Sequence, residues 1–109
     1  MLVTAGVHGD EYPGIAASIR VAGELNPEEM SGNVLFVHCV NVSGFYGKNR
    51  RVPEDGGNLN ADFPGKRGGT VSEQIEMCIR DRQHIFSHFS YFNTGVDFRC
   101  RVCTFHIHP

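Results

Sequence analysis

The feature that most constrains the fold is a continuous apolar run, Asn33–Val40 (NVLFVHCV). A run of this length that contains β-branched residues is typical of a strand buried on both faces. A shorter apolar run, residues 2–5, precedes it. Between the two, residues 12–25 carry Ile15 and Ile19 at helical spacing, and Asn-Pro follows. The sequence therefore predicts a strand, a helix and a second strand, in that order.

This order predicts the fold class. Parallel strands need a crossover connection, usually a helix, and such crossovers are right-handed. We expect strands 2–5 and 33–40 to be adjacent and parallel, with helix 12–25 packed on one face. The chain is then an α/β protein, with a mixed or parallel sheet flanked by helices in a three-layer-like arrangement. Its 109 residues fit one domain, 1–109.

Composition excludes several classes of partner. The net charge of -2 gives no electrostatic reason to bind nucleic acid or an anionic membrane. No apolar run approaches the ~20 residues of a membrane span, and no signal peptide precedes the first strand. Cys39 is expected to be a buried thiol. Cys100-x-x-Cys103 fits a redox pair or half of a zinc site, but no second such pair exists, and the default is a reducing, cytoplasmic setting.

Residues 41–69 form a long segment rich in Gly, Asn and Pro, with little helical or strand periodicity. So long a loop in a compact domain is usually functional or disordered. Its phenylalanines and its Asn and Arg groupings favour function. From Val71 onward the sequence predicts a helix, with Ser72 as a candidate cap.

The segment Gly6–Glu11 (GVHGDE) carries the first candidate for chemistry. His8 and Glu11 are three residues apart, in a bend where a strand gives way to a helix. Zn²⁺ takes imidazole nitrogen and carboxylate oxygen at roughly 2.0–2.2 Å, so both side chains can reach one cation. Gly6 and Gly9 allow the backbone angles that this approach needs. The alternative is an incidental surface pair.

Two other groups of polar residues have competing interpretations. His38 lies inside the apolar run and is interpreted as a core or edge histidine rather than a ligand. Lys48, Arg50 and Arg51 form either a solvated basic cluster or part of a site.

Further blocks of sequence carry a family resemblance. Asn41-Val-Ser-Gly-Phe is followed by Arg50-Arg-Val-Pro-Glu-Asp-Gly-Gly-Asn-Leu-Asn-Ala-Asp-Phe-Pro-Gly65 and then by Ser72-Glu-Gln-Ile. With His-Gly-Asp-Glu, these blocks resemble the succinylglutamate desuccinylase/aspartoacylase family, which is similar to the zinc carboxypeptidases and shares their α/β fold. All blocks occur in family order, over residues 1 to about 76. The resemblance implies that the chain is the N-terminal portion of such a catalytic domain, with a partial zinc-carboxypeptidase-like fold.

The resemblance assigns roles by position. His8 and Glu11 match the first two zinc ligands. Arg50 matches the arginine that polarises the scissile carbonyl, with Arg51 as the fallback if the register slips by one. Asn60 matches the asparagine that holds the substrate carboxylate, and Arg51 is the other candidate for substrate binding.

The activity implied is zinc-dependent hydrolysis of the amide bond of an N-acyl amino acid or a similar small molecule, with one Zn²⁺ per complete site. Zinc lowers the pKa of bound water toward ~7 and polarises the carbonyl. A guanidinium, which keeps its charge at working pH, suits the developing oxyanion.

The chain departs from the family pattern at several positions. Ala61 replaces the arginine that follows Asn60, which removes a bidentate donor for a substrate carboxylate. The third zinc ligand is expected in a motif whose nearest counterpart is Tyr91-Phe-Asn-Thr-Gly95, where Asn93 occupies the histidine position. A neutral amide is a poor zinc ligand.

Other histidines offer no simple replacement for that ligand. His84 or His88 could substitute only if the local backbone shifted. His106 and His108 are interpreted as surface histidines.

Two function classes follow from these departures. No residue matches the family's general-base glutamate, and the pattern lapses at Met77-Cys-Ile-Arg-Asp-Arg82, which resembles translated sequencing-adapter sequence. We therefore expect an N-terminal piece of a zinc-dependent deacylase, truncated and inactive by itself. The alternative is a non-catalytic fragment or degenerate homologue that keeps only the fold and ligand binding.

Overall fold

The computed structural model describes residues 1–88 and 105–108, with side chains described up to Asp81. Its centre is a three-stranded sheet in the order β1-β2-β3. Strand β1 (Leu2–Thr4) pairs in parallel with β2 (Val34–Val37), as predicted, with Val3 opposite Phe36. Both strands are shorter than the predicted ranges. Strand β3 (Phe105–His108), which the sequence analysis did not predict, pairs antiparallel with β2 and makes the sheet mixed.

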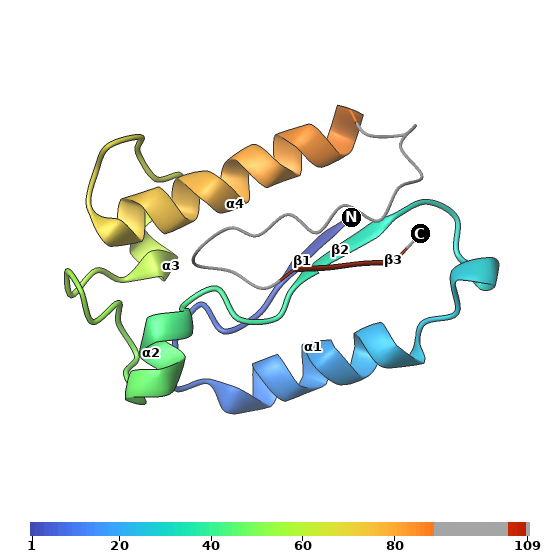
Figure 1. Ribbon diagram of the computed structural model, residues 1–109, viewed down its shortest axis with the longest axis horizontal. Coiled ribbons are helices and arrows are strands. Elements are labelled where there is room, and N and C mark those ends of the chain that lie inside the picture. The colour runs from blue at the N-terminus through green and yellow to red at the C-terminus, as the bar shows by residue number, and fades with distance from the viewer. Residues whose placement is uncertain (89–104, 109) are drawn as a thin grey trace.

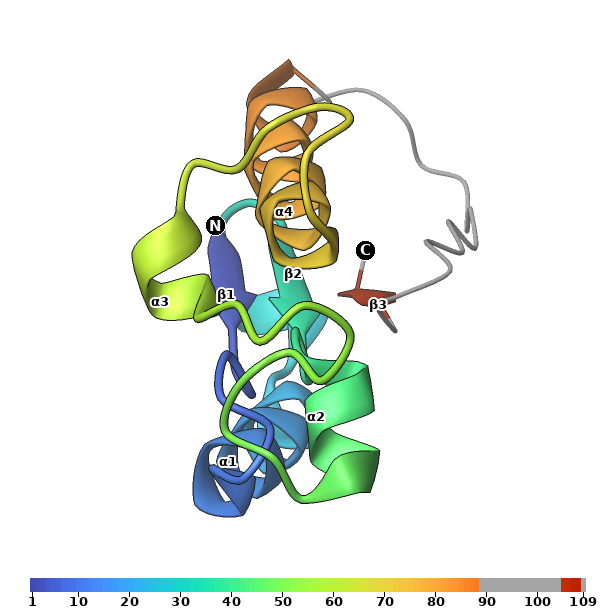
Figure 2. The ribbon, with the colours of Figure 1, turned by 90° about the vertical axis from the view of Figure 1, so that its left-hand side faces the viewer.

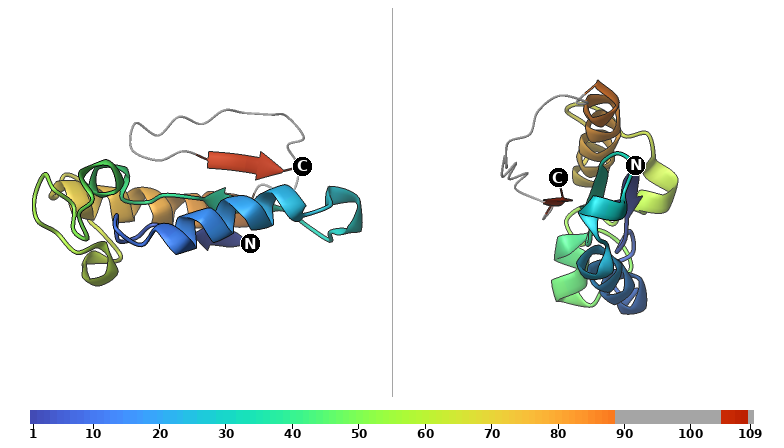
Figure 3. Two further views of the ribbon diagram at one scale, coloured as in Figure 1. Left: turned by 90° about the horizontal axis from the view of Figure 1, so that it is seen from below. Right: turned by 90° about the vertical axis from the view of Figure 1, so that its right-hand side faces the viewer.

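Helices cover both faces of the sheet. Helix α1 (Tyr12–Glu24) lies on one side and α4 (Val71–His88) on the other, which gives three layers (Figures 1 and 2). A 3-10 turn, η1 (Pro27–Glu29), leads from α1 back to β2, and β3 flanks β2 on the side away from β1 (Figure 3). The α/β class and the packing of helix 12–25 on one face are confirmed. Within the described residues, no helix is long and apolar enough to cross a membrane.

Strand β2 is apolar throughout because it is buried on both faces. Val37 belongs to a cluster on the α4 side, and Val34 and Phe36 belong to a cluster on the α1 side. The first cluster contains Val37, Val40, Val52, Leu59, Ile75 and Ile79, and the second contains Ala22, Val34 and Phe36. Burial of each Val, Leu, Ile or Phe side chain in these clusters contributes about 1.5–3 kcal/mol before entropy costs.

Two short helices interrupt the segment that was predicted to be a long loop. Helix α2 (Val42–Gly47) and helix α3 (Leu59–Asp62) each follow an asparagine whose side-chain oxygen accepts a backbone N–H. These are Asn41, which accepts from Gly44, and Asn58, which accepts from Asn60. A helix of one turn is too short for an apolar period, so capping by asparagine is its main signal.

The start of α4 differs from the prediction. Ser72 is not its cap. Thr70 and Glu73 form a capping box instead, in which the Thr70 N–H donates to Glu73 Oε2 at 2.8 Å and the Glu73 N–H donates to Thr70 Oγ1 at 3.4 Å. The N–H and Oγ of Ser72 both donate to Asp55 Oδ2, at 2.7 and 2.8 Å. Asp55 thereby ties the segment of residues 41–69 to α4.

The residues that follow β2 have structural roles. His38 Nδ1 lies 3.0 Å from Ser18 Oγ, and its ring stacks on Phe36, which agrees with a core or edge histidine. Cys39 lies beyond the end of β2 and is half-buried as a free thiol, so it is less enclosed than predicted. Cys100 and Cys103 lie outside the described residues.

Candidate active site

The candidate site lies at the carboxyl ends of the two parallel strands, where open α/β sheets bind ligands. His8 stands in the loop after β1, and Glu11 directly precedes α1. Gly6 has a φ of +62°, in the left-handed region that favours glycine. A Cβ on Gly9 would overlap backbone atoms of Gly44 in α2, so the loop packs against α2 with no room for a side chain at residue 9.

The side chains of His8, Glu11 and Arg50 converge. His8 Nδ1 lies 2.8 Å from Glu11 Oε1, and Arg50 Nη1 donates to the same oxygen at 3.0 Å. The His8 side chain is only 9% exposed, whereas those of Glu11 and Arg50 are 50% and 57% exposed. The hydrogen bond from His8, with help from Arg50, holds the pKa of Glu11 below its usual value. The site thus presents one buried imidazole to a solvent-accessible carboxylate.

Asn58 is a residue of this site that the sequence analysis missed. His8 Nε2 lies 3.1 Å from Asn58 Oδ1, and the same oxygen accepts the backbone N–H of Asn60 at 3.2 Å. Because Oδ1 is an acceptor in both contacts, Nε2 must carry a hydrogen. The cap before α3 was visible in the sequence, but its second partner, His8, was not.

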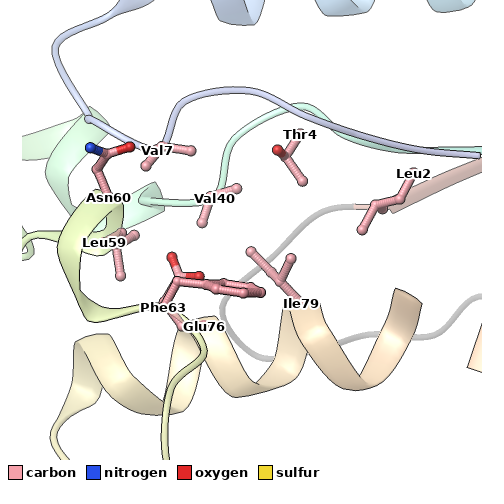
Figure 4. A pocket seen from close by; sticks show the side chains of 9 residues that line it. All are labelled: Leu2, Thr4, Val7, Val40, Leu59, Asn60, Phe63, Glu76 and Ile79. Carbon is pink, nitrogen blue, oxygen red and sulfur yellow. The ribbon is translucent and has the colours of Figure 1, made fainter. Parts of the chain in front are cut away.

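The two remaining predicted site residues make no hydrogen bond to Glu11 among the described residues. Arg51 does not join Arg50: its Nη1 donates to the carbonyl of Gly56 at 3.0 Å and so braces the loop. Asn60 is exposed in the first turn of α3 and lines a cavity next to Val7, the residue before His8 (Figure 4).

This cavity, of about 450 Å³, lies between the β1 side of the sheet and α4. Six of its nine lining residues are apolar: Leu2, Thr4, Val7, Val40, Leu59, Asn60, Phe63, Glu76 and Ile79 line it together. Figure 4 shows Asn60 near one end, Leu2 near the other, and the Glu76 carboxylate directed from α4 into the space between. Burial, reinforced by the charge of Asp62, raises the pKa of Glu76 to about 7. No sequence pattern predicted this buried acid.

The donor chemistry of the site fits zinc in part. His8 Nδ1 and Glu11 Oε1 are a nitrogen and an oxygen of the kinds zinc prefers, side by side. His8 also donates its other ring N–H, the usual arrangement for a metal-bound histidine. Within the described residues, no group of three or more His, Cys, Asp or Glu side chains could hold a metal ion. Asn93, like the side chains of His84 and His88, lies outside what is described.

Fold and site together define an α/β protein with the zinc-carboxypeptidase-like fold. The family model for the succinylglutamate desuccinylase/aspartoacylase catalytic domain matches residues 1–98, and the chain belongs to this family. The resemblance inferred from the sequence blocks is therefore confirmed.

One relative is a deacylase by name. The N-alpha-acetyl-L-2,4-diaminobutyric acid deacetylase of Halomonas elongata is 43% identical over 74 residues, which are 68% of this chain and 22% of the relative. The product-bound ectoine utilization protein EutE (DoeB) of Ruegeria pomeroyi is 35% identical, with a TM-score of 0.69 over 78% of this chain and 26% of its own.

An aspartoacylase family protein from Mesorhizobium loti is 35% identical, with a TM-score of 0.72 over 78% of this chain and 27% of that protein. The chain therefore spans roughly a quarter of the length of these relatives.

Proposed function

We propose that this chain is the N-terminal, zinc-ligating part of a deacylase that cleaves the amide bond of N-acyl amino acids. The observation that carries the proposal is the convergence of His8 and Arg50 on one oxygen of Glu11. Membership in the family supports hydrolysis of an acyl bond, and the Halomonas relative is named for an acetylated diamino acid. N-acyl amino acids in general are the substrate class that we propose.

In this proposal His8 and Glu11 hold the zinc ion. A zinc ion at such a site lowers the pKa of bound water and polarises a carbonyl. The protein's own contribution is orientation. Asn58 accepts the hydrogen of His8 Nε2, so Nδ1, on the side of Glu11, is the ring nitrogen that would bind the metal ion.

Arg50 and Asn60 are proposed to handle the substrate. The exposed Arg50 guanidinium is a permanent cation beside the two proposed ligands, where it can stabilise negative charge that develops on the scissile carbonyl oxygen. Asn60 lies on α3, whose cap contacts His8, so an amide donor for the substrate carboxylate stands close to the proposed ligands. Arg51, which braces Gly56, is a weaker candidate for substrate binding.

We propose that the chain by itself binds zinc weakly and hydrolyses at background rates. A catalytic zinc site normally has three protein ligands, and the position aligned with the third is Asn93. Ala61 also lacks the guanidinium that would accompany Asn60 in carboxylate binding. These two residues favour the second candidate function, a ligand-binding fragment without catalysis.

Zinc titration against a competing chelator tests the proposal. Glu11→Gln should weaken zinc binding, because it removes a charged ligand. Glu28→Gln is the matched control, since it makes the same change on exposed η1 and should leave binding unchanged. Asn93→His should strengthen binding while hydrolysis of N-acyl amino acids stays near background.

The outcomes separate the possibilities. Equal zinc affinity in the wild type and Glu11→Gln would refute the metal site. Unchanged affinity in a folded Asn93→His protein would show that Asn93 is not the lost ligand. Robust hydrolysis by the unmodified chain would refute the claim that it is inactive.

A further inference from the structure

The cavity beside Asn60 contains an acid that the proposed mechanism does not use. Glu76 is only 5% exposed, although glutamate is rarely buried without a partner. Its carboxylate points into the cavity (Figure 4), and within the described part of the chain nothing donates a hydrogen bond to it. A buried carboxylate in this position lacks the solvation or pairing that would stabilise its charge.

A second carboxylate stands close by. Asp62, in α3, raises the energy of an ionised Glu76 by like-charge repulsion. Asp62 Oδ2 is itself buried and has no hydrogen-bond partner among the described residues. Asp62 does not line the cavity, so it adds negative charge beside it, and Glu76 is the carboxylate that a cation in the cavity would meet.

The cavity suits an organic cation better than a metal ion. The described residues offer no set of three His, Cys, Asp or Glu ligands, and the walls around Glu76 are apolar: Leu59, Phe63 and Ile79. Apolar walls with one buried carboxylate match a short alkyl chain that ends in an ammonium group. Asn60 lies near one end of the same cavity, so a substrate held there can extend its side chain toward Glu76.

We propose that this cavity binds the side-chain ammonium group of an acylated diamino acid, with Glu76 as its counter-ion and Asp62 as the neighbouring charge. This inference rests on the proposed function, which it narrows from N-acyl amino acids in general to those with a short cationic side chain. Glu76 is then a specificity-determining residue, placed away from the proposed zinc ligands.

NMR titration of the isotope-labelled chain tests this inference. The titration is run at about pH 8, where the Glu76 carboxylate and the ammonium group of the ligand are both charged. The two probes are N-α-acetyl-L-2,4-diaminobutyrate and N-α-acetyl-L-2-aminobutyrate, which differ in the side-chain amine. The wild type should bind the first roughly 10-fold to 100-fold more tightly, the usual range for a charge-assisted hydrogen bond. Glu76→Gln should abolish the preference, and Glu28→Gln, the exposed control, should keep it.

The outcomes distinguish failure of the ammonium site from failure of the proposed substrate class. If both probes bind the wild type equally, the ammonium site is refuted and the proposed substrate class stands. If neither binds, the proposed substrate class is refuted for this chain, and the ammonium site with it. The comparison of the two probes on the wild type decides the question even if Glu76→Gln fails to fold.

Discussion

His8 Nε2 lies 3.1 Å from the side-chain oxygen of Asn58, fifty residues further along the chain. That oxygen also caps α3 through the N–H of Asn60. One amide oxygen therefore fixes both the ring of a proposed zinc ligand and the helix that carries a proposed substrate-binding residue. A second partner of this kind commonly sets the tautomer and orientation of a metal-bound histidine.

Asn58→Ala should weaken both the fold and zinc binding. It leaves Nε2 of the buried His8 without its partner and removes the cap of α3, at a cost of about 1–2 kcal/mol in the free energy of unfolding. Zinc affinity, measured against a competing chelator, should fall by roughly 10-fold to 100-fold. Asn26→Ala is the matched control, because Asn26 caps η1 in the same way, away from His8. Equal zinc affinity in the two variants would contradict a positioning role for Asn58.

Gly9→Ala should strongly destabilise the protein. Its Cβ would overlap the backbone of Gly44 and Phe45, which cannot move aside by rotating a side chain. We expect a loss of at least about 2 kcal/mol by chemical denaturation, toward the upper part of the range for overpacking. Gly14→Ala makes the same change in α1, where nothing lies within 4 Å of the new Cβ. It should stabilise the protein by about 0.5–1 kcal/mol, and a similar loss in both variants would refute the close approach at Gly9.

Asp55→Ala should remove the link between the segment of residues 41–69 and α4. The free energy of unfolding should fall by about 1–2 kcal/mol. Although desolvation alone would raise the pKa of Asp55, hydrogen bonds from Ser72 and Gly57 lower it from 3.8 to about 2. This stabilisation is therefore present above about pH 3.8 and is lost as the pH falls through about 2. Unfolding of the wild type and Asp55→Ala, followed by circular dichroism, should converge over that range. The exposed Glu54→Ala should track the wild type, and a constant difference for Asp55→Ala would exclude its charge as the cause.

Glu76 should make the protein less stable as the pH rises. Burial first, and then the charge of Asp62, raise the pKa of Glu76 from 4.5 to about 7, so the folded state holds this proton more tightly than the unfolded state does. The stabilisation is complete below about pH 4.5 and is lost as the pH rises through about 7. The melting temperature of Glu76→Gln should therefore exceed that of the wild type increasingly over this interval. Parallel melting profiles would show that Glu76 is solvated in the folded protein.

Much of the fold could be predicted from local patterns. The run around β2 is apolar because both faces of the strand are covered. The apolar residues of α1 recur at helical spacing because one side of the helix packs on the sheet. Both patterns can be read from neighbouring residues in the sequence. The short helices α2 and α3 show no such apolar pattern. At the start of α4, Ser72 and Thr70 are both acceptable capping residues, and only the contact with Asp55 decides how Ser72 is used.

What the sequence by itself determined is the strand–helix–strand core and the pairing of His8 with Glu11, because three residues in one bend keep two side chains within reach of each other. Tertiary structure alone decided that Arg50 rather than Arg51 reaches Glu11, that Asn58 contacts His8, and that Glu76 is buried beside Asp62. These contacts join residues on different elements. They depend on how the helices and loops pack against the sheet, and no spacing along the chain encodes that packing.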